Sequence, residues 1–311
     1  MVPVVRSADD SITDQVLPFL IDARSIRGRL VRLGPALDQI LAGHAYPWSV
    51  SQRMAEALAL AAALAAAIKY DGVFTLQIQG DGAIPLLVVD VQSNGDIRGY
   101  ARYESDKLAD ADAADPSTPP VPRYLGKGIL AFTVDQGADT ERYQGIVELS
   151  GDRLEDCAKL YFEQSEQLET AFKLAAKPGK QGWRASALMI QRMPMGPNSP
   201  IITAEDSAEN WNRAKILLGS ATEAELLDPE LAPGTLLHRL YHAEQLETHA
   251  SRPLQARCRC SEARVETTLR SFPQPEIEDL KDEDGHVVVT CEYCKTAYSF
   301  SQADLDRLFA L

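Results

Sequence analysis

Alternating apolar and polar positions recur through the chain before residue 194 and predict β-strands. In a half-buried strand, successive side chains face opposite sides of the sheet, so apolar residues occupy every second position. The dipeptides Asp81-Gly82 and Asn94-Gly95 separate such runs, and both favour the turns of β-hairpins. The alternation predicts strands over residues 27–33, 73–80, 84–91, 97–104, 128–136, 143–150 and 183–193, and leaves a short apolar segment at 16–23.

Helical spacing of apolar residues appears between these strands. Residues 35–41 predict a short helix, and residues 49–70 predict a long helix that begins at Ser51 as N-cap and is apolar nearly all round, which indicates burial. Residues 152–174 predict an amphipathic helix. Residues 108–122, rich in Ala, Asp and Pro, predict an exposed loop.

The chain changes character after residues 193–200, a Met, Pro and Gly-rich stretch that indicates a boundary. Residues 203–250 predict short helices, and Thr222 and Glu225 have the spacing of a capping box. This stretch carries nine acidic and three basic side chains, and its short apolar groups need a neighbour to pack on. The predicted fold is α+β: a mixed α/β domain with meandering sheets and buried helices, a metastable helical linker and a small C-terminal module, over residues 1–204, 205–255 and 256–311.

Composition narrows the class of protein. The 311 residues are 45% hydrophobic, which indicates a folded chain, and they suggest about two domains. With 31 basic and 45 acidic side chains the net charge is −14, which argues against general binding to nucleic acid or anionic membranes. The N-terminus lacks a secretory signal, and the most apolar stretch, 54–68, is too short to span a bilayer. We expect a cytoplasmic protein.

Four of the five cysteines lie close together near the C-terminus, as Cys258-Arg-Cys260 and Cys291-Glu-Tyr-Cys294. In an extended segment residues i and i+2 face the same side, and a Cys-x-x-Cys turn also directs two sulfurs to one point. Four thiolates suit tetrahedral Zn²⁺. Because the module has few large apolar residues, metal binding would supply much of its folding energy.

Three interpretations of these four cysteines remain: unrelated core cysteines, a static structural zinc site, or a redox-sensitive zinc site. The third has a chemical basis, because zinc-bound thiolates stay deprotonated and react with peroxide or hypochlorite. Each pair is adjacent, so disulfides Cys258–Cys260 and Cys291–Cys294 could form without long-range motion. Zinc would then be released, and the module and any element packed on it would loosen.

Other candidate residues are weaker. His286 lies near the second cysteine pair in the sequence. It could be a fifth metal ligand, a residue that contacts the ligands or a surface residue. We expect Cys157 to be a buried apolar residue, and His238 and His242 to be exposed residues of the linker. The glycine-containing turns fit no phosphate-binding loop, so no ATP site is predicted.

With the cysteine pattern established, the chain resembles the heat shock protein 33 family of redox-regulated holdase chaperones. The resemblance is colinear over nearly the whole chain and rests on CRCSEARV (258–265), VTCEYCKTAYSF (289–300), YFEQSEQ (161–167), LQIQGDG (76–82), RGYAR (98–102), YQGIVEL (143–149) and EALALAAALAA (56–66). It departs at the insertion-like 108–122, at Glu169, where Pro is common in the family, and at 185–187, which contain less Gly than expected. None of these departures touches the cysteines.

The resemblance implies a specific, non-enzymatic function. In the reduced state one Zn²⁺ per chain is held by Cys258, Cys260, Cys291 and Cys294, the linker is docked, and the monomer is inactive. Oxidation forms the disulfides Cys258–Cys260 and Cys291–Cys294 and releases zinc. The linker then unfolds, and a homodimer binds unfolding client proteins without ATP during oxidative stress.

Two other functions remain open from the residues alone. One is a structural zinc-ribbon adaptor for protein or nucleic acid, although residues 253–311 carry seven bases and eleven acids, which disfavours nucleic acid. The other is a thiol–disulfide oxidoreductase that uses Cys291 and Cys294. That function requires the pair at a helix N-terminus, whereas the flanking residues here are strand-like.

Overall fold

The computed structural model describes residues 14–22, 25–137, 142–194 and 203–310. The chain divides into two compact units, Met1–Ala256 and Arg257–Leu311, and each is described by itself. Most of the boundary expected at 193–200, the N-terminal stretch before residue 14 and Ala23 at the end of the apolar segment 16–23 lie outside the described residues.

The first unit contains two sheets of six strands each. All pairings in the first sheet are antiparallel. Its order is β10 (Glu247–Thr248), β1 (Gln15–Ile21), β2 (Ile26–Leu33), β9 (Gly182–Arg192) and β8 (Thr170–Gly179), and β11 (Arg252–Pro253) also pairs with β1.

The second sheet confirms the predicted hairpins. Gly95 has a φ of 94° in the turn between strands β4 (Leu86–Gln92) and β5 (Asp96–Arg102), a conformation that suits glycine. Strand β12 (Gln255–Ala256) joins in parallel, beside β5, and the other pairings are antiparallel. The order is β12 (Gln255–Ala256), β5 (Asp96–Arg102), β4 (Leu86–Gln92), β3 (Val73–Gly80), β6 (Gly128–Asp135) and β7 (Tyr143–Glu148).

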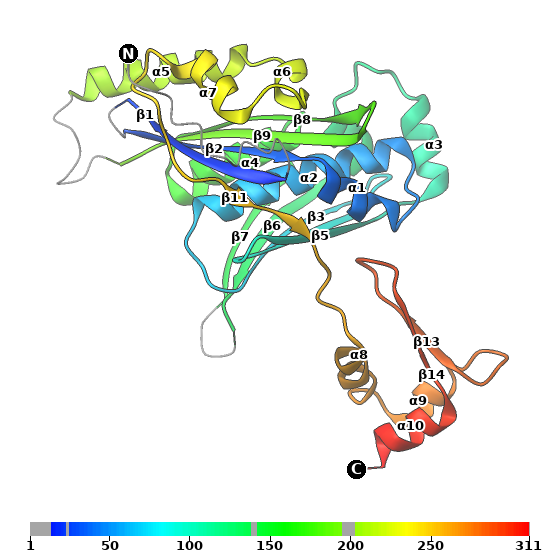
Figure 1. The fold of residues 1–311 in the computed structure, drawn as a ribbon. Helices are drawn as coiled ribbons and strands as arrows, with labels where there is room; N and C mark the ends of the chain where they lie inside the picture. Colours follow the sequence, from blue (N-terminus) through cyan, green and yellow to red (C-terminus); the bar gives the residue numbers. More distant parts are fainter. Residues whose placement is uncertain (1–13, 23–24, 138–141, 195–202, 311) are drawn as a thin grey trace. The chain divides into compact units, whose positions relative to one another are not determined.

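The long helix α2 (Trp48–Ala67) contacts strands of both sheets and is buried along almost its whole length, as its all-apolar sequence predicts (Figure 1). Its small Ala side chains let strands approach from two sides, which places it in the main hydrophobic core. The short helix α1 (Pro35–Ala42) precedes it, as predicted. The predicted N-cap was wrong: Pro47 occupies that position, and Ser51 already lies in the first turn, where its N–H donates to the Pro47 carbonyl.

The predicted helix over 152–174 is also wrong in its second half. Helix α4 (Leu154–Tyr161) continues into one wide helical turn, η2 (Phe162–Glu166), and Gln167 then adopts a left-handed φ of 53°, which ends the helix. The chain continues as strand β8, fully paired with β9. Ala, Lys and Leu favour helix locally, but pairing with a long neighbouring strand overrides that weak preference.

The predicted exposed loop at 108–122 is partly ordered and partly buried. Residues at its start belong to helix α3 (Ser105–Ala113), and its end enters a second wide helical turn, η1 (Val121–Leu125). Leu108 and Ala111 are buried three positions apart on one face of α3. Two apolar residues among many acids were enough to anchor this helix, although composition alone suggested solvent exposure.

Three helices cover the face of the first sheet opposite α2 (Figure 1): α5 (Ala204–Ser220), α6 (Glu223–Leu227) and α7 (Pro233–Tyr241). The capping box predicted for Thr222 and Glu225 is present at α6. These helices share a hydrophobic cluster with strands of the sheet, so they have the packing neighbour that their sequence requires. We call residues 204–241 the linker helices.

The second unit is small and built around one hairpin. Strands β13 (Val287–Thr290) and β14 (Ala297–Phe300) pair antiparallel, and the helices are α8 (Glu262–Leu269), α9 (Gln274–Glu278) and α10 (Gln302–Phe309). Among its described residues the core contains six buried apolar side chains: Leu269, Ile277, Val287, Phe300, Leu305 and Leu308. Among the residues that the structure describes in the whole chain, no helix has the length and apolar character needed to cross a membrane.

Candidate metal centre

The four clustered cysteines come from two segments of the second unit. Cys258 and Cys260 precede α8, and Cys291 and Cys294 lie in the turn that joins β13 to β14. Backbone hydrogen bonds tighten that turn: the Cys291 N–H donates to the Thr296 carbonyl at 2.9 Å, and the Lys295 N–H to the Cys291 carbonyl at 2.8 Å. The turn therefore presents both of its thiols on one side.

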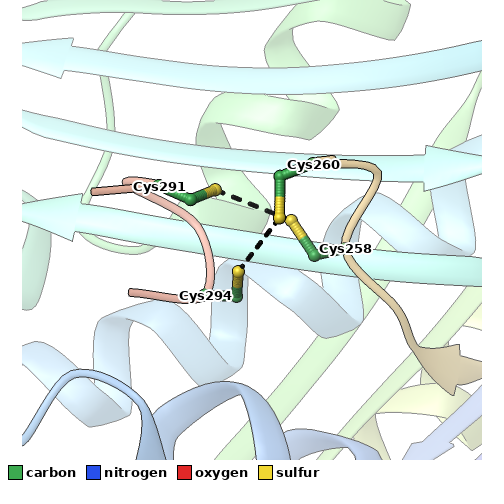
Figure 2. Close-up of side chains that lie close together, drawn as sticks. All are labelled: Cys258, Cys260, Cys291 and Cys294. Carbon is green, nitrogen blue, oxygen red and sulfur yellow. Dashed lines mark hydrogen bonds between the residues drawn. The ribbon is translucent and has the colours of Figure 1, made fainter. Parts of the chain in front are cut away.

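The four sulfur atoms converge on one point, as Figure 2 shows. All of them lie within 4.8 Å of one another. The sulfurs of Cys258 and Cys291 are 3.7 Å apart, and those of Cys260 and Cys294 are 3.4 Å apart. Four ligands at about 2.3 Å from a tetrahedral ion would be separated by about 3.8 Å. The arrangement therefore fits a four-coordinate metal ion.

Crowding of the thiols shifts their acidity. Burial, followed by the neighbouring thiols Cys294 and Cys258, raises the pKa of Cys260 to about 12, although Tyr298 donates a hydrogen bond to its sulfur at 3.2 Å. For Cys294, burial acts upward, but hydrogen bonds from the Thr296 hydroxyl and backbone N–H bring its pKa down to about 7. A bound cation would stabilise all four thiolates together, which is the requirement for a metal ligand set.

Comparison with known proteins places the chain in a family. The family model described as "Hsp33 protein" matches residues 14–301. The chain belongs to the Hsp33 family. Curated relatives in this family include the 33 kDa chaperonin of Caulobacter vibrioides, 37% identical over 92% of this chain and 94% of the relative. The 33 kDa chaperonin of Ectopseudomonas mendocina is 39% identical over 94% of each chain.

A solved Hsp33 structure has the same fold. The 33 kDa chaperonin from Thermotoga maritima superposes with a TM-score of 0.76 at 22% identity, covering 95% of this chain and 97% of that one. The mixed α and β architecture predicted from the sequence is therefore that of the Hsp33 family. The resemblance inferred from the quoted motifs is confirmed by both the sequence and the structural relatives.

The remaining candidate residues of this Hsp33 chain are not members of the cysteine cluster. Cys157 is fully buried in α4, where burial raises the pKa of its thiol to about 11, which makes it inert. His286 is absent from the group of metal-competent side chains, and its backbone N–H donates to the Asp282 carboxylate at 2.8 Å. His238 and His242 are exposed, with ring centroids 5.5 Å apart.

Sequence reasoning missed two side chains around the cluster. Tyr298 on β14 donates to Cys260, and the Thr296 hydroxyl oxygen lies 3.2 Å from the Cys294 sulfur. Thr296 is two positions after Cys294 in a tight turn, and that spacing was a usable signal. The Tyr298 contact crosses from one segment to the other and had no local signal.

The Cys291–Cys294 turn joins two strands, so it lacks the helix N-terminus of an oxidoreductase site.

Proposed function

We propose that this Hsp33-family protein is a redox-regulated holdase chaperone that works without ATP and without enzymatic turnover. The observation that carries the proposal is the convergence of four cysteine sulfurs inside a unit with only six buried apolar side chains in its described core. A unit with so small a core depends on its metal ion for stability.

Zn²⁺ is the metal that the donor set favours. Four sulfurs in tetrahedral arrangement suit Zn²⁺ or an iron–sulfur cluster, and this site has room for one ion among sulfurs that all lie within 4.8 Å of one another. Structural zinc sites contribute about 10–16 kcal/mol of binding energy at pH 7. In the proposed reduced state Cys258, Cys260, Cys291 and Cys294 would hold one ion and keep residues 256–311 folded.

Oxidation is the proposed trigger. Each disulfide forms when two thiols lose two electrons and two protons, and peroxide, which accepts them, is reduced to water. We propose the pairs Cys258–Cys260 and Cys291–Cys294, because partners within each pair are adjacent in sequence. The two short sulfur–sulfur contacts in the structure, Cys258 to Cys291 and Cys260 to Cys294, each join a cysteine of one pair to a cysteine of the other. Such contacts are expected around a tetrahedral ion, where every sulfur neighbours the other three. Disulfide sulfurs bind zinc poorly, so the ion would leave.

Release of the linker would then switch the chaperone on. The linker helices cover an apolar sheet face that includes Phe19, Ile26 and Leu30, and they bury Trp211 and Tyr241 against it. Undocking would expose both surfaces to partly folded client proteins, and the oxidised protein would form a homodimer, whereas the reduced protein would remain a monomer. The proposed division is 1–204 for the chaperone core, 205–255 for the linker and 256–311 for the switch.

Three properties complete the proposal. The protein would act in the cytoplasm, where glutathione and thioredoxin keep thiols reduced, as the zinc-loaded resting state requires. The net charge of −14 supports the expectation that neither nucleic acid nor membrane is its partner. Clients would bind through exposed apolar surface, which requires no nucleotide.

Aggregation of a heat-unfolded client, followed by light scattering, tests this function. Zinc-loaded reduced protein is compared with the same protein after peroxide treatment and again after reduction with a dithiol. The proposal predicts suppression only in the oxidised sample, reversed by the dithiol. A Cys157→Ala variant is the matched control and should behave as the parent, because Cys157 is buried in the first unit and is not one of the four clustered cysteines. Absence of suppression in every state would leave a structural zinc-ribbon adaptor.

A further inference from the structure

A basic cavity lies in the first unit, where the end of α2 meets strands β2 and β11. Its volume is about 670 Å³. Strand β11 runs beside β1, so segments far apart in sequence meet here (Figure 1). A neighbouring cavity of about 560 Å³ shares its three arginines. The cationic side chains that line the larger cavity are Arg27, Arg29, Lys69 and Arg252.

No acidic side chain among the described residues balances the positive charge of this cavity. No described Asp or Glu lines either cavity, and none of the four cationic side chains forms an ion pair with a described residue. Elsewhere in the same unit Arg98 pairs with Asp90 at 2.6 Å. Burial, and then the charges of Arg27 and Arg252, lower the pKa of Arg29 to about 10. In a chain of net charge −14, such an uncompensated cluster is unexpected.

Two of the arginines are held in place by hydrogen bonds that leave part of each guanidinium available. Arg29 donates from Nε to the Ala66 carbonyl at 3.0 Å and from Nη1 to the Gly28 carbonyl at 2.7 Å. Arg27 uses Nε and Nη2 to donate to Gln191. The third nitrogen of each guanidinium donates to no described residue. The side chains are therefore oriented before any ligand arrives, which lowers the entropic penalty of binding.

A purely structural role explains only part of the cluster. Arg29 stabilises the C-terminal end of α2 through the Ala66 carbonyl, as cations do at helix C-termini. That role does not require Arg27, Lys69 or Arg252 to face the same cavity. Lys69 and Arg252 are exposed residues that line it, and placing them beside two half-buried arginines is unfavourable without an anion.

We propose that this cavity binds an oligophosphate anion, as an inorganic ion or as the phosphate chain of a nucleotide. The guanidinium group of arginine can donate two parallel hydrogen bonds to two oxygens of one phosphate. Several guanidinium groups therefore suit an anion with several phosphate groups. The volume falls in the range of small-ligand sites and exceeds the space of one phosphate. Ser93 and Asn94 in the lining turn add neutral hydrogen-bonding side chains.

Titration calorimetry with inorganic triphosphate tests the site on full-length, reduced, zinc-loaded protein at low salt. The parent should bind, and Arg252→Glu and Lys69→Glu should each weaken binding at least tenfold. The matched control is Lys180→Glu, the same charge change at an exposed position in the turn between β8 and β9, without an ion pair among described residues. The control should bind within about twofold of the parent, because it differs in net charge only.

Thermal melting and two further ligands complete the test. Triphosphate should raise the melting midpoint of the parent and leave that of Arg252→Glu unchanged, which also shows whether the variant is folded. Equal affinity for pyrophosphate and ADP would support recognition of the phosphates alone, and tighter binding of ADP would support the nucleotide as source. Absence of binding to the parent, or equal weakening in Lys180→Glu and Arg252→Glu, would overturn the proposal.

Discussion

The linker helices differ from the C-terminal unit in the interactions that stabilise each of them. The linker region contributes eleven side chains to a hydrophobic cluster completed by seven from the first sheet. Phe19 of the sheet and Tyr241 of α7 stack with ring centroids 5.7 Å apart. The C-terminal unit, although it is longer, has six buried apolar side chains in its described core and four sulfurs around one point. One region is stabilised by packing on a neighbour, whereas for the other we propose stabilisation by a metal ion.

A polar contact strengthens this contrast. Arg32 of β2 is 4% exposed and donates to the carbonyls of Glu225, Asp228 and Leu231 at 2.6–3.1 Å. The sheet therefore holds the linker by its backbone as well as by its apolar side chains. A region stabilised in this way can detach as a unit and leave the sheet intact, whereas a metal-dependent unit loses its structure when its ligands change.

The largest expected effect comes from Cys291→Ser. Structural zinc sites contribute a binding free energy of about 10–16 kcal/mol, and loss of one of four thiolates should remove much of it. The C-terminal unit should therefore unfold even under reducing conditions. The linker should loosen as well. Zinc content and protease sensitivity measure both effects, with Cys157→Ala as the control that keeps its zinc. If Cys291→Ser retains zinc and resists protease like the parent, the switch assignment is wrong.

Packing of the linker is tested by Leu236→Ala. Leu236 on α7 is fully buried, so truncation should destabilise the docked linker by about 2–5 kcal/mol. Ile216 on α5 is 73% exposed, and Ile216→Ala should change stability by less than about 0.5 kcal/mol. Hydrogen exchange of α5–α7 measures the difference. Equal exchange in the two variants would show that packing on the sheet does not stabilise the linker.

The backbone contact is tested by Arg32→Met. The substitution keeps an apolar stem and removes the donors to three linker carbonyls, so the docked linker should lose about 1.5–3 kcal/mol. Arg239→Met is the matched control, because Arg239 is 56% exposed and 3.7 Å from Glu225, a pair worth less than about 1 kcal/mol. Urea unfolding of both variants separates them, and a control as destabilised as Arg32→Met would refute the role given to Arg32.

The smallest expected effect compares one helix cap in each region. Thr222 caps α6 and Ser301 caps α10, each in a capping box. Thr222→Ala and Ser301→Ala should each destabilise their own helix by about 0.5–2 kcal/mol. With zinc saturating, hydrogen exchange should rise in α6 for the first variant and in α10 for the second. A rise in both helices for either variant would mean that the two regions open together.

Local signals predicted the features that depend on neighbouring residues in the sequence. The turn at Asn94-Gly95 predicted a hairpin, and the spacing of Thr222 and Glu225 predicted a cap. The spacing of the four cysteines predicted their convergence, because a metal site imposes the same geometry on any chain that binds it. These features need no knowledge of the remainder of the fold.

Long-range contacts decided the features that sequence reasoning missed. Residues 170–179 favour helix locally but form a strand because β9 lies beside them. Arg32 sits in an alternating strand like its neighbours Arg27 and Arg29, and no local pattern distinguishes its role. Its acceptors lie almost two hundred residues away, with separations of 193 to 199 positions. The basic cavity has the same origin, since its cationic side chains come from three separate segments.

Hydrogen exchange of the linker before and after oxidation tests the central claim most directly, namely that the thiol state of the four cysteines controls docking of the linker helices. Zinc-loaded reduced protein is compared with peroxide-oxidised protein, peptide by peptide. We predict that residues 204–241 lose protection on oxidation, while the buried helix α2 keeps it and the dithiol restores the linker. Full loss of zinc with unchanged protection in α5–α7 would contradict the account.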